Sequence, residues 1–384
     1  MREVAVIGVG MTKVGQHFDK ALRDLFVDAA LKAFDDAGNP NIDALYVGNM
    51  VAGEAIGQSN LGAYLADYLG VKVPAFHIES ACSSGGAAFI LGVLGVMSGY
   101  FDTVLVGGVE KLTEYPTQTT TLHLAGAAEQ EYEVYFGASF TSLNAMIMRY
   151  YMHKFNVPRE YFAEWPVMMH ENATKNPYAQ LRFKTTIEKV LSSPIIADPL
   201  TLFDCSPTGD GAAAVIITTV ENAKKITDTI VKVAGFGMGV DSISLAMRNE
   251  LTTLAASVNA SRKAYKMAKI EPKDVDVAEI HDAFSIMAIL AIEDLGFSEK
   301  GKGAIDLHDG KYAKDGDIAL NPSGGLKARG HPVGATGVYQ IAEITLQLRG
   351  DAGEMQVPDA EIGLAQNIGG SGSSITVSIL KRER

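Results

Sequence analysis

Apolar and polar residues alternate along the first hundred residues in the pattern of an α/β protein. Short apolar runs, such as VAVIGVG at 4–10 and TVLVGGV at 103–109, predict strands. Between them, LRDLFVDAALKAFDDAG at 22–38 and a stretch from about Gly85 to Gly99 have the spacing and length of helices. This alternation of strands and helices predicts the α/β fold class.

The second half of the chain repeats the pattern of the first half. DAALKAFDDAGNPNIDALYVGN at 28–49 and SRKAYKMAKIEPKDVDVAEIHD at 261–282 match as helix, short loop and strand. Between about residues 112 and 204 the sequence becomes polar, aromatic and Met-rich, which predicts an inserted lobe. We therefore expect an internal duplication, with one half at 1–225 that includes the lobe and the other at 226–384.

Charge and composition limit the classes of partner. A formal net charge of −12 argues against nucleic acid or an anionic membrane as the main partner, because both need a cationic surface. No unbroken apolar run reaches the ~20 residues of a membrane helix, and the N-terminus does not have the layout of a secretory signal. A cytoplasmic protein is expected. The two cysteines, Cys82 and Cys205, have no CxxC spacing, so neither a disulfide framework nor a metal site is predicted.

The glycines of the first predicted strand invite a dinucleotide interpretation that the sequence supports only weakly. Gly8, Gly10 and Gly15 give GxGxxxxG rather than GxGxxG, and no acidic residue follows the next strand to bind a ribose.

Cys82 is a candidate nucleophile. It lies in ESACSSGGAAF, directly after an apolar strand and before a Gly/Ala-rich helix, where the helix dipole and free N–H groups stabilise a thiolate. The small residues that follow, Gly85 and Gly86 among them, would let a substrate approach the backbone. The alternative is a small buried thiol at a packed turn, which is the commoner role of a lone cysteine.

Three further segments carry candidate chemistry. His331 lies in GGLKARGHPVGATG, where five glycines in fourteen residues surround one imidazole, and it could take a proton from Cys82. His281 in EIHDAF follows a strand, where α/β folds place functional groups. QNIGGSGSS offers backbone N–H groups for an oxyanion hole. The alternatives are a loop histidine that caps a helix and a histidine of the core.

Together these segments resemble the thiolase family over almost the whole chain. The resemblance rests on the Cys82 loop, on HDAF at 281–284, on GHPVGATG at 330–337 and on the terminal Gly-rich turn. HDAF, together with ADPLTLFDCSPTGDGAAA at 197–214, is similar to the branch that contains sterol-carrier-protein-X thiolases and archaeal acetoacetyl-CoA thiolases. The resemblance implies the thiolase fold, in which two similar halves form a five-layer α/β/α/β/α sandwich with an inserted loop lobe.

The resemblance also implies a role for each matching residue. Cys82 would be the acylated nucleophile, and His331 would be its activating base and a donor to the thioester oxygen. His281 would help to form that oxyanion hole. The N–H groups of Cys82 and Gly369 would form the second hole, and Phe284 would line the acyl pocket. Coenzyme A thioesters would be substrates, and no cofactor is implied.

One departure from the family pattern concerns the acid/base thiol. Most thiolases carry a second cysteine, either in the terminal CxG turn or in an HDCF motif, and this sequence has Asn367 and Ala283 at those places. A structural role is expected for Cys205. Either His281 or His331 would then take the α-proton of the incoming acetyl group, or the chain does not perform the ordinary condensation.

The resulting hypothesis is acetyl-CoA C-acetyltransferase activity, in which two acetyl-CoA molecules give acetoacetyl-CoA and CoA through acetyl-Cys82, feeding HMG-CoA and mevalonate synthesis. The alternatives are a thiolase for longer or branched 3-ketoacyl-CoA esters and a non-condensing acyl-CoA-binding scaffold subunit. The resemblance implies a homodimer or tetramer, and partners such as HMG-CoA synthase and a small zinc-containing OB-fold protein.

Overall fold

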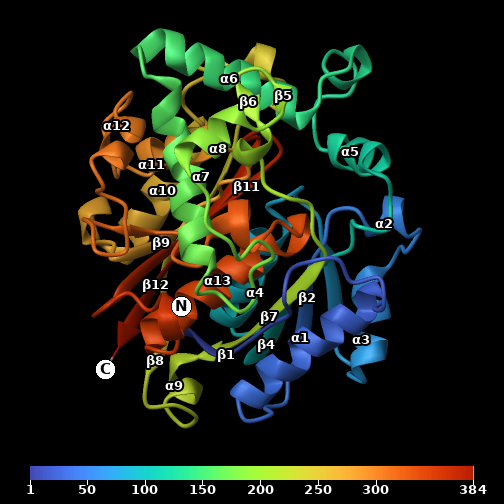
Figure 1. Ribbon diagram of the computed structural model, residues 1–384. Helices are drawn as coiled ribbons and strands as arrows, with labels where there is room; N and C mark the ends of the chain where they lie inside the picture. The colour runs from blue at the N-terminus through green and yellow to red at the C-terminus, as the bar shows by residue number, and fades with distance from the viewer. Residues whose placement is uncertain (384) are drawn as a thin grey trace.

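A single mixed sheet runs through the protein. The computed structural model describes residues 1–383, and across these residues ten strands pair in the order β3-β2-β4-β7-β1-β8-β12-β11-β9-β10 (Figure 1). The strands of the first half are β1 (Val4–Met11), β2 (Ala44–Gly48), β3 (Ala75–Ile78), β4 (Thr103–Glu110) and β7 (Gly211–Thr219). Those of the second half are β8 (Ile230–Val240), β9 (Val277–Glu279), β10 (Ala319–Leu320), β11 (Ile362–Gly369) and β12 (Ser374–Glu383).

The two halves of the sheet repeat one topology. In the first half β1 is antiparallel to β7, β7 is antiparallel to β4, and β4, β2 and β3 are parallel. In the second half β8, β12, β11, β9 and β10 follow the same order and directions. The halves join where β1 pairs with β8, at Ala5 opposite Lys232 and Val6 opposite Val231. An internal duplication predicts this arrangement, and the boundary at residues 225 and 226 stays a prediction.

Helices cover both outer faces of the sheet and fill the space between its halves. α1 (Leu22–Asp36) and α3 (Leu61–Leu69) pack on the first half, and α10 (Ala255–Ala268) and α11 (Ser285–Asp294) on the second. α4 (Ser84–Ser98) and α13 (Thr336–Arg349) lie between them. Three large hydrophobic clusters separate these layers in the described part of the chain. The five-layer α/β/α/β/α architecture is therefore confirmed.

The glycines of β1 and β8 allow close packing of a helix. A Cβ on Gly10 would lie 2.1 Å from the carbonyl oxygen of Ala29 in α1, and a Cβ on Gly237 would lie 2.0 Å from that of Ala260 in α10. Real Cβ atoms do not come so close, so only glycine fits there. Helix packing, repeated in both halves, explains the opening GxG pattern without a nucleotide.

A lobe is inserted between β4 and β7. It contains α5 (Thr117–Ala125), α6 (Phe140–Phe155), α7 (Arg159–Ala173), α8 (Ile187–Ser192), and the small strands β5 (Ile195–Ala197) and β6 (Leu200–Thr201). Figure 1 shows α7 beside α11 and α12 (Gly303–His308) of the second half, and α6 also contacts α11. Trp165 of α7 donates a hydrogen bond from Nε1 to Asp282 Oδ2 at 2.9 Å, which attaches the lobe next to His281.

One segment, Ala81–Ser98, is long and apolar enough to span a membrane by length and composition. It is mostly buried inside the protein, because α4 lies between the two halves of the sheet. Its apolar character is thus explained by its place in the central layer.

Candidate active site

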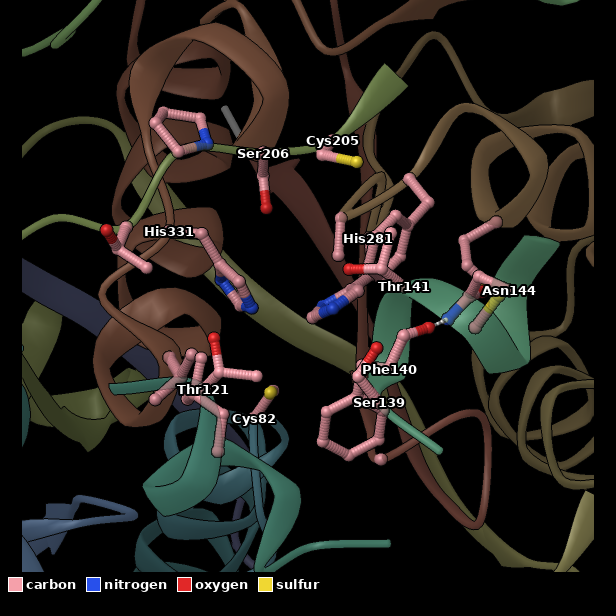
Figure 2. A pocket seen from close by; sticks show the side chains of 18 of the residues that line it. Cys82, Thr121, Ser139, Phe140, Thr141, Asn144, Cys205, Ser206, His281 and His331 are labelled. Atoms are coloured by element: carbon pink, nitrogen blue, oxygen red, sulfur yellow. Dashed lines mark hydrogen bonds between the residues drawn. The ribbon is translucent and has the colours of Figure 1, made fainter. Parts of the chain in front are cut away.

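The carboxyl ends of parallel strands from both halves meet at one pocket of about 380 Å³. Cys82 follows β3, His281 follows β9, and Gly370 follows β11. His331 enters from the loop before α13, and Figure 2 shows the two imidazoles pointing into the pocket above Cys82. The structure thus brings together Cys82, His281, His331 and Phe284, all of which line this pocket.

A tight turn before α4 presents Cys82. Ala81 has a φ of +52°, in the left-handed region that costs a non-glycine residue roughly 1–2 kcal/mol. The carboxylate of Glu79 accepts the Ala81 N–H, and the Ser84 hydroxyl accepts the Ser80 N–H at 2.9 Å. Such strain persists only where surrounding contacts hold it, and it is common at nucleophiles.

Cys82 is a neutral thiol in the free site. Burial raises the pKa of Cys82 to about 12, and the charge of Glu110 acts in the same direction, although the N–H groups of Cys82 and Gly370 lower this pKa. Burial therefore opposes the thiolate that the helix N-terminus is expected to stabilise, and the N–H groups offset it only in part. A base has to take the proton as the sulfur attacks.

The glycines that follow Cys82 serve packing. A Cβ on Gly85 would lie 2.9 Å from the carbonyl oxygen of Gly334, and a Cβ on Gly86 would lie 2.1 Å from Thr376 Oγ1. The expectation that they let a substrate approach is wrong. They let α4 touch the start of α13 and the strands of the other half.

The contacts of His331 assign its proton to Nδ1. Nδ1 lies 2.7 Å from Thr336 Oγ1, and the Thr336 hydroxyl donates its single hydrogen to the carbonyl oxygen of Pro332 at 3.2 Å. The hydroxyl oxygen therefore accepts from Nδ1–H, which leaves Nε2 with a free lone pair in the pocket. An imidazole in this form can accept a proton.

The contacts of His281 assign the opposite tautomer. Its Nδ1 lies 3.2 Å from Asn367 Nδ2 and 3.2 Å from the backbone nitrogen of Ile368, and both of these groups are donors. Nδ1 must therefore be the acceptor, and Nε2 carries the hydrogen. The two rings are perpendicular, at 89°, with centroids 5.0 Å apart. The pocket thus presents one lone pair and one N–H.

Both imidazoles are held neutral. Burial lowers the pKa of His281 to about 3, with a further contribution from the Arg329 cation. Burial, His281 and Arg329 together lower the pKa of His331 well below its usual value. Neither imidazole is charged at neutral pH.

Two buried charged groups support the histidine loop. Glu110 accepts a hydrogen bond from the Gly334 N–H at 3.0 Å and another from Met50 N–H at 2.9 Å, which ties the His331 loop to the first half. Arg329, fully buried two residues before His331, has its Nε 3.0 Å from Glu343 Oε1. Burial raises the pKa of Glu110 to about 7 and that of Glu343 to about 7.

The terminal Gly-rich turn reaches the sulfur through Gly370. The Gly370 N–H faces Cys82, and Gly370 lines the pocket. Gly369, the residue chosen from the sequence, pairs with Ser374 in the β11–β12 ladder. Its role in an oxyanion hole stays a prediction.

Cys205 lies on the far wall of the same pocket, across from Cys82 (Figure 2). Its backbone bridges Phe284, and the next residue, Ser206, donates its N–H to the carbonyl oxygen of Ala283 at 2.9 Å. The Cys205 thiol donates to the Thr201 carbonyl oxygen at 3.5 Å. These contacts favour a wall role over proton transfer at Cys82.

The lobe contributes pocket residues that sequence reasoning missed. Phe140 and Asn144 lie one helical turn apart on α6, so they share a face, and both line the pocket. Asn144 is buried, and its Nδ2 donates to the Phe140 carbonyl oxygen at 2.9 Å. A polar residue on an otherwise apolar helical face was the available signal. Among the described residues, no group of three or more His, Cys, Asp or Glu side chains is placed to hold a metal ion.

Family models match both halves of the chain. The thiolase N-terminal domain matches residues 4–221, and a thiolase C-terminal domain-like model matches residues 237–382. The acetyl-CoA acetyltransferase of Methanothermobacter thermautotrophicus is 49% identical over 385 residues, with 100% of both chains covered.

More distant relatives match over almost the whole chain. Human sterol carrier protein 2 is 31% identical, with 99% of this chain and 72% of that protein covered. The solved Ltp2–ChsH2(DUF35) aldolase has a TM-score of 0.87 at 22% identity, with 100% of this chain and 98% of that chain covered, which shows a shared fold.

Proposed function

Because this chain belongs to the thiolase family, we propose that it is an acetyl-CoA C-acetyltransferase. Two acetyl-CoA molecules would give acetoacetyl-CoA and CoA, reversibly, through acetyl-Cys82. The observation that carries the proposal is the pocket itself, in which one thiol faces an imidazole lone pair and an imidazole N–H. Full-length similarity to an acetyl-CoA acetyltransferase supports the choice of acyl group.

The first half-reaction acetylates Cys82. The sulfur attacks the thioester carbonyl carbon while its proton moves to His331 Nε2. The N–H groups of Cys82 and of the terminal Gly-rich turn stabilise the tetrahedral oxyanion. The bond to the CoA sulfur then breaks, and the CoA thiolate leaves with the proton from His331. This step restores the lone pair on Nε2.

The second half-reaction needs a base for the α-proton of a second acetyl-CoA. We assign this role to His331 Nε2, because His281 has its lone pair engaged on Nδ1. The His281 Nε2–H stabilises the negative charge that develops on the thioester oxygen. The α-carbon attacks the acetyl carbonyl, the bond to Cys82 breaks, and Cys82 recovers its proton from His331. One imidazole thus serves both half-reactions.

Isotope exchange tests the proposal and separates it from its alternatives. Labelled CoA should exchange into acetyl-CoA, because a covalent acetyl-enzyme is reversible, and acetoacetyl-CoA should form with ping-pong kinetics. Exchange without condensation would favour a scaffold subunit that is only acylated. If folded protein shows neither exchange nor condensation, the proposal is refuted. Faster thiolysis of longer or branched 3-ketoacyl-CoA esters than of acetoacetyl-CoA would favour the other thiolase activity.

The exchange rate should keep its neutral-pH value on acidification through pH 6.5. The reaction requires neutral imidazoles, and the lowered pKa values of His281 and His331 keep both rings neutral below the usual histidine range. The activity should be lost only as the pH falls through the lowered values. A pH profile of exchange, with folding followed by circular dichroism, checks this. A fall in the exchange rate centred near pH 6.5 would contradict the lowered pKa values of the two histidines.

We also propose that the protein forms homo-oligomers and works with a partner that consumes acetoacetyl-CoA, such as HMG-CoA synthase in mevalonate synthesis, together with a small OB-fold protein. The solved aldolase, named as the pair Ltp2–ChsH2(DUF35), supports only the point that this fold occurs with a partner protein. Co-purification of the native protein from its cells, followed by mass spectrometry, tests the partners.

A further inference from the structure

Asn367 occupies the position at which most thiolases carry the CxG cysteine, and its side chain is used in an unusual way. Its Oδ1 accepts the N–H of Gly86, near the start of α4, at 3.2 Å. Its Nδ2 donates to Nδ1 of His281 at 3.2 Å. Asn367 is 2% exposed and does not line the pocket, so its amide connects the nucleophile's helix to one catalytic imidazole from behind.

We propose that Asn367 is a positioning residue that, together with the Ile368 N–H, keeps the hydrogen of His281 on Nε2, so that His281 is a permanent hydrogen-bond donor and His331 is the only base. The proposal rests on the proposed function, because it assigns roles within the same reaction. An amide at this place offers two distinct ends, an oxygen for Gly86 N–H and an NH₂ for Nδ1. A cysteine offers a single sulfur, which is only a weak donor and a weak acceptor, for both contacts. Asn367 thus stands in place of the usual acid/base thiol, and its amide holds the His281 imidazole in one tautomer.

An isosteric substitution tests the contact between the Asn367 NH₂ group and His281 Nδ1. In Asn367→Asp, one carboxylate oxygen can still accept the Gly86 N–H, while the other replaces the NH₂ that faces Nδ1. The carboxylate favours a hydrogen on Nδ1, and its charge-assisted hydrogen bond outweighs the opposing Ile368 N–H. The ring becomes either the Nδ1–H form, with no donor at Nε2, or an imidazolium whose pKa the new carboxylate raises. In Asn367→Ala, the Ile368 N–H is the one donor left at Nδ1, so the Nε2–H tautomer loses one of its two supports without meeting a competing charge.

The groups around His281 set the background for a pH experiment. The Arg329 cation lowers the pKa of His281, and His331 faces it across the pocket. The remaining titratable or charged groups on the surrounding elements are Glu279, Asp282, Glu343, Cys82, Cys205, Glu110 and Lys327. All of these are present in the wild type and in both variants, so a new ionisation in Asn367→Asp comes from the contact between the introduced carboxylate and His281.

The expected result is a change in one half-reaction with a new pH dependence. At pH 8, Asn367→Asp should slow condensation at least tenfold more than CoA exchange. Condensation by this variant should recover as the pH falls, because protonation of His281 restores the Nε2–H and is lost as the pH rises through the raised pKa. Asn367→Ala should lose about tenfold or less, equally at every pH, which controls for loss of packing.

A direct measurement of the tautomer completes the test. ¹⁵N chemical shifts of the histidines in wild-type protein, assigned with a His281→Gln variant, should show Nε2–H at His281 and should change in Asn367→Asp. The proposal is overturned if wild-type His281 carries Nδ1–H, or if Asn367→Asp slows exchange and condensation equally at all pH values. Failure of the proposed function would instead appear as missing exchange or condensation in the wild type.

Discussion

Cys82→Ala is expected to abolish labelling of the protein by acetyl-CoA in intact-mass measurements and to reduce CoA exchange and condensation by roughly 10⁴-fold or more. In the proposed mechanism, the Cys82 sulfur forms a bond to the acetyl group in one half-reaction and breaks it in the other, so no neighbouring group can replace it. The turn that presents it is held by contacts to Glu79 and Ser84 that do not involve the sulfur, so the variant should keep its fold.

Cys205→Ala is the matched control for this prediction. It removes the other thiol of the same pocket, which donates to the Thr201 carbonyl oxygen on the opposite wall. This variant should still take up one acetyl group and should keep exchange within about tenfold of the wild type. Acetylation of Cys82→Ala at Cys205 would reverse the assignment of the nucleophile. Loss of condensation with normal exchange in Cys205→Ala would make Cys205 the missing acid/base thiol.

The sequence was sufficient for the fold and for four of the residues that line the pocket, which are Cys82, His281, Phe284 and His331. Strands with flanking helices occur in both halves, and motif residues follow strand ends or precede helices. Cys82 and His281 come directly after β3 and β9, and the carboxyl ends of parallel strands are where α/β proteins gather functional groups. The apolar pattern of the central strands encodes this directly, because these strands are buried between two helical layers.

The sequence could not give the tautomers or the use of glycines, because both depend on contacts between segments far apart in the chain. The assignment at His281 rests on a donor at position 367, and that at His331 on which way the Thr336 hydroxyl points. From the sequence, Gly85 and Gly86 are equally compatible with room for a substrate and with close helix packing. The contact between α4 and the start of α13 decides for packing. The ionisation of Cys82 likewise depends on burial and on Glu110, which comes from another strand.

The sequence also does not predict how the lobe contributes to the pocket. The lobe was predicted from its polar, aromatic and Met-rich composition. Nothing in that composition says that the Phe140–Asn144 face of α6 lines the pocket together with Phe284 of the second half. In the proposed enzyme, the packing between the lobe and the second half would set the acyl-chain preference.

Arg329→Met is expected to destabilise the folded protein by about 3–5 kcal/mol, because it leaves the buried carboxyl of Glu343 without its cation. The guanidinium also lies over the ring of Tyr339, with 4.8 Å between its carbon and the ring centroid, and it donates to the Gly330 carbonyl oxygen at 2.9 Å. These contacts hold the chain immediately before His331. Methionine has a similar length and keeps the apolar packing, so the change isolates the charge.

The loss in free energy of unfolding caused by Arg329→Met should increase with pH. Burial already raises the pKa of Glu343 to about 7 against the opposing effect of Arg329, so removal of the cation raises it further. Such a carboxyl has a higher pKa in the folded state than in the unfolded state. It stabilises the fold in the range where it binds a proton only when folded, most fully at pH values below its pKa in the unfolded state. This contribution is lost as the pH rises through its pKa in the folded state. Urea unfolding at pH 5.5 and pH 8 measures the difference. Arg329→Met/Glu343→Gln removes both charges and should recover more than half of the loss at pH 8. A loss below about 1 kcal/mol in the single variant, or no recovery in the double variant, would show that the ion pair does not hold this loop.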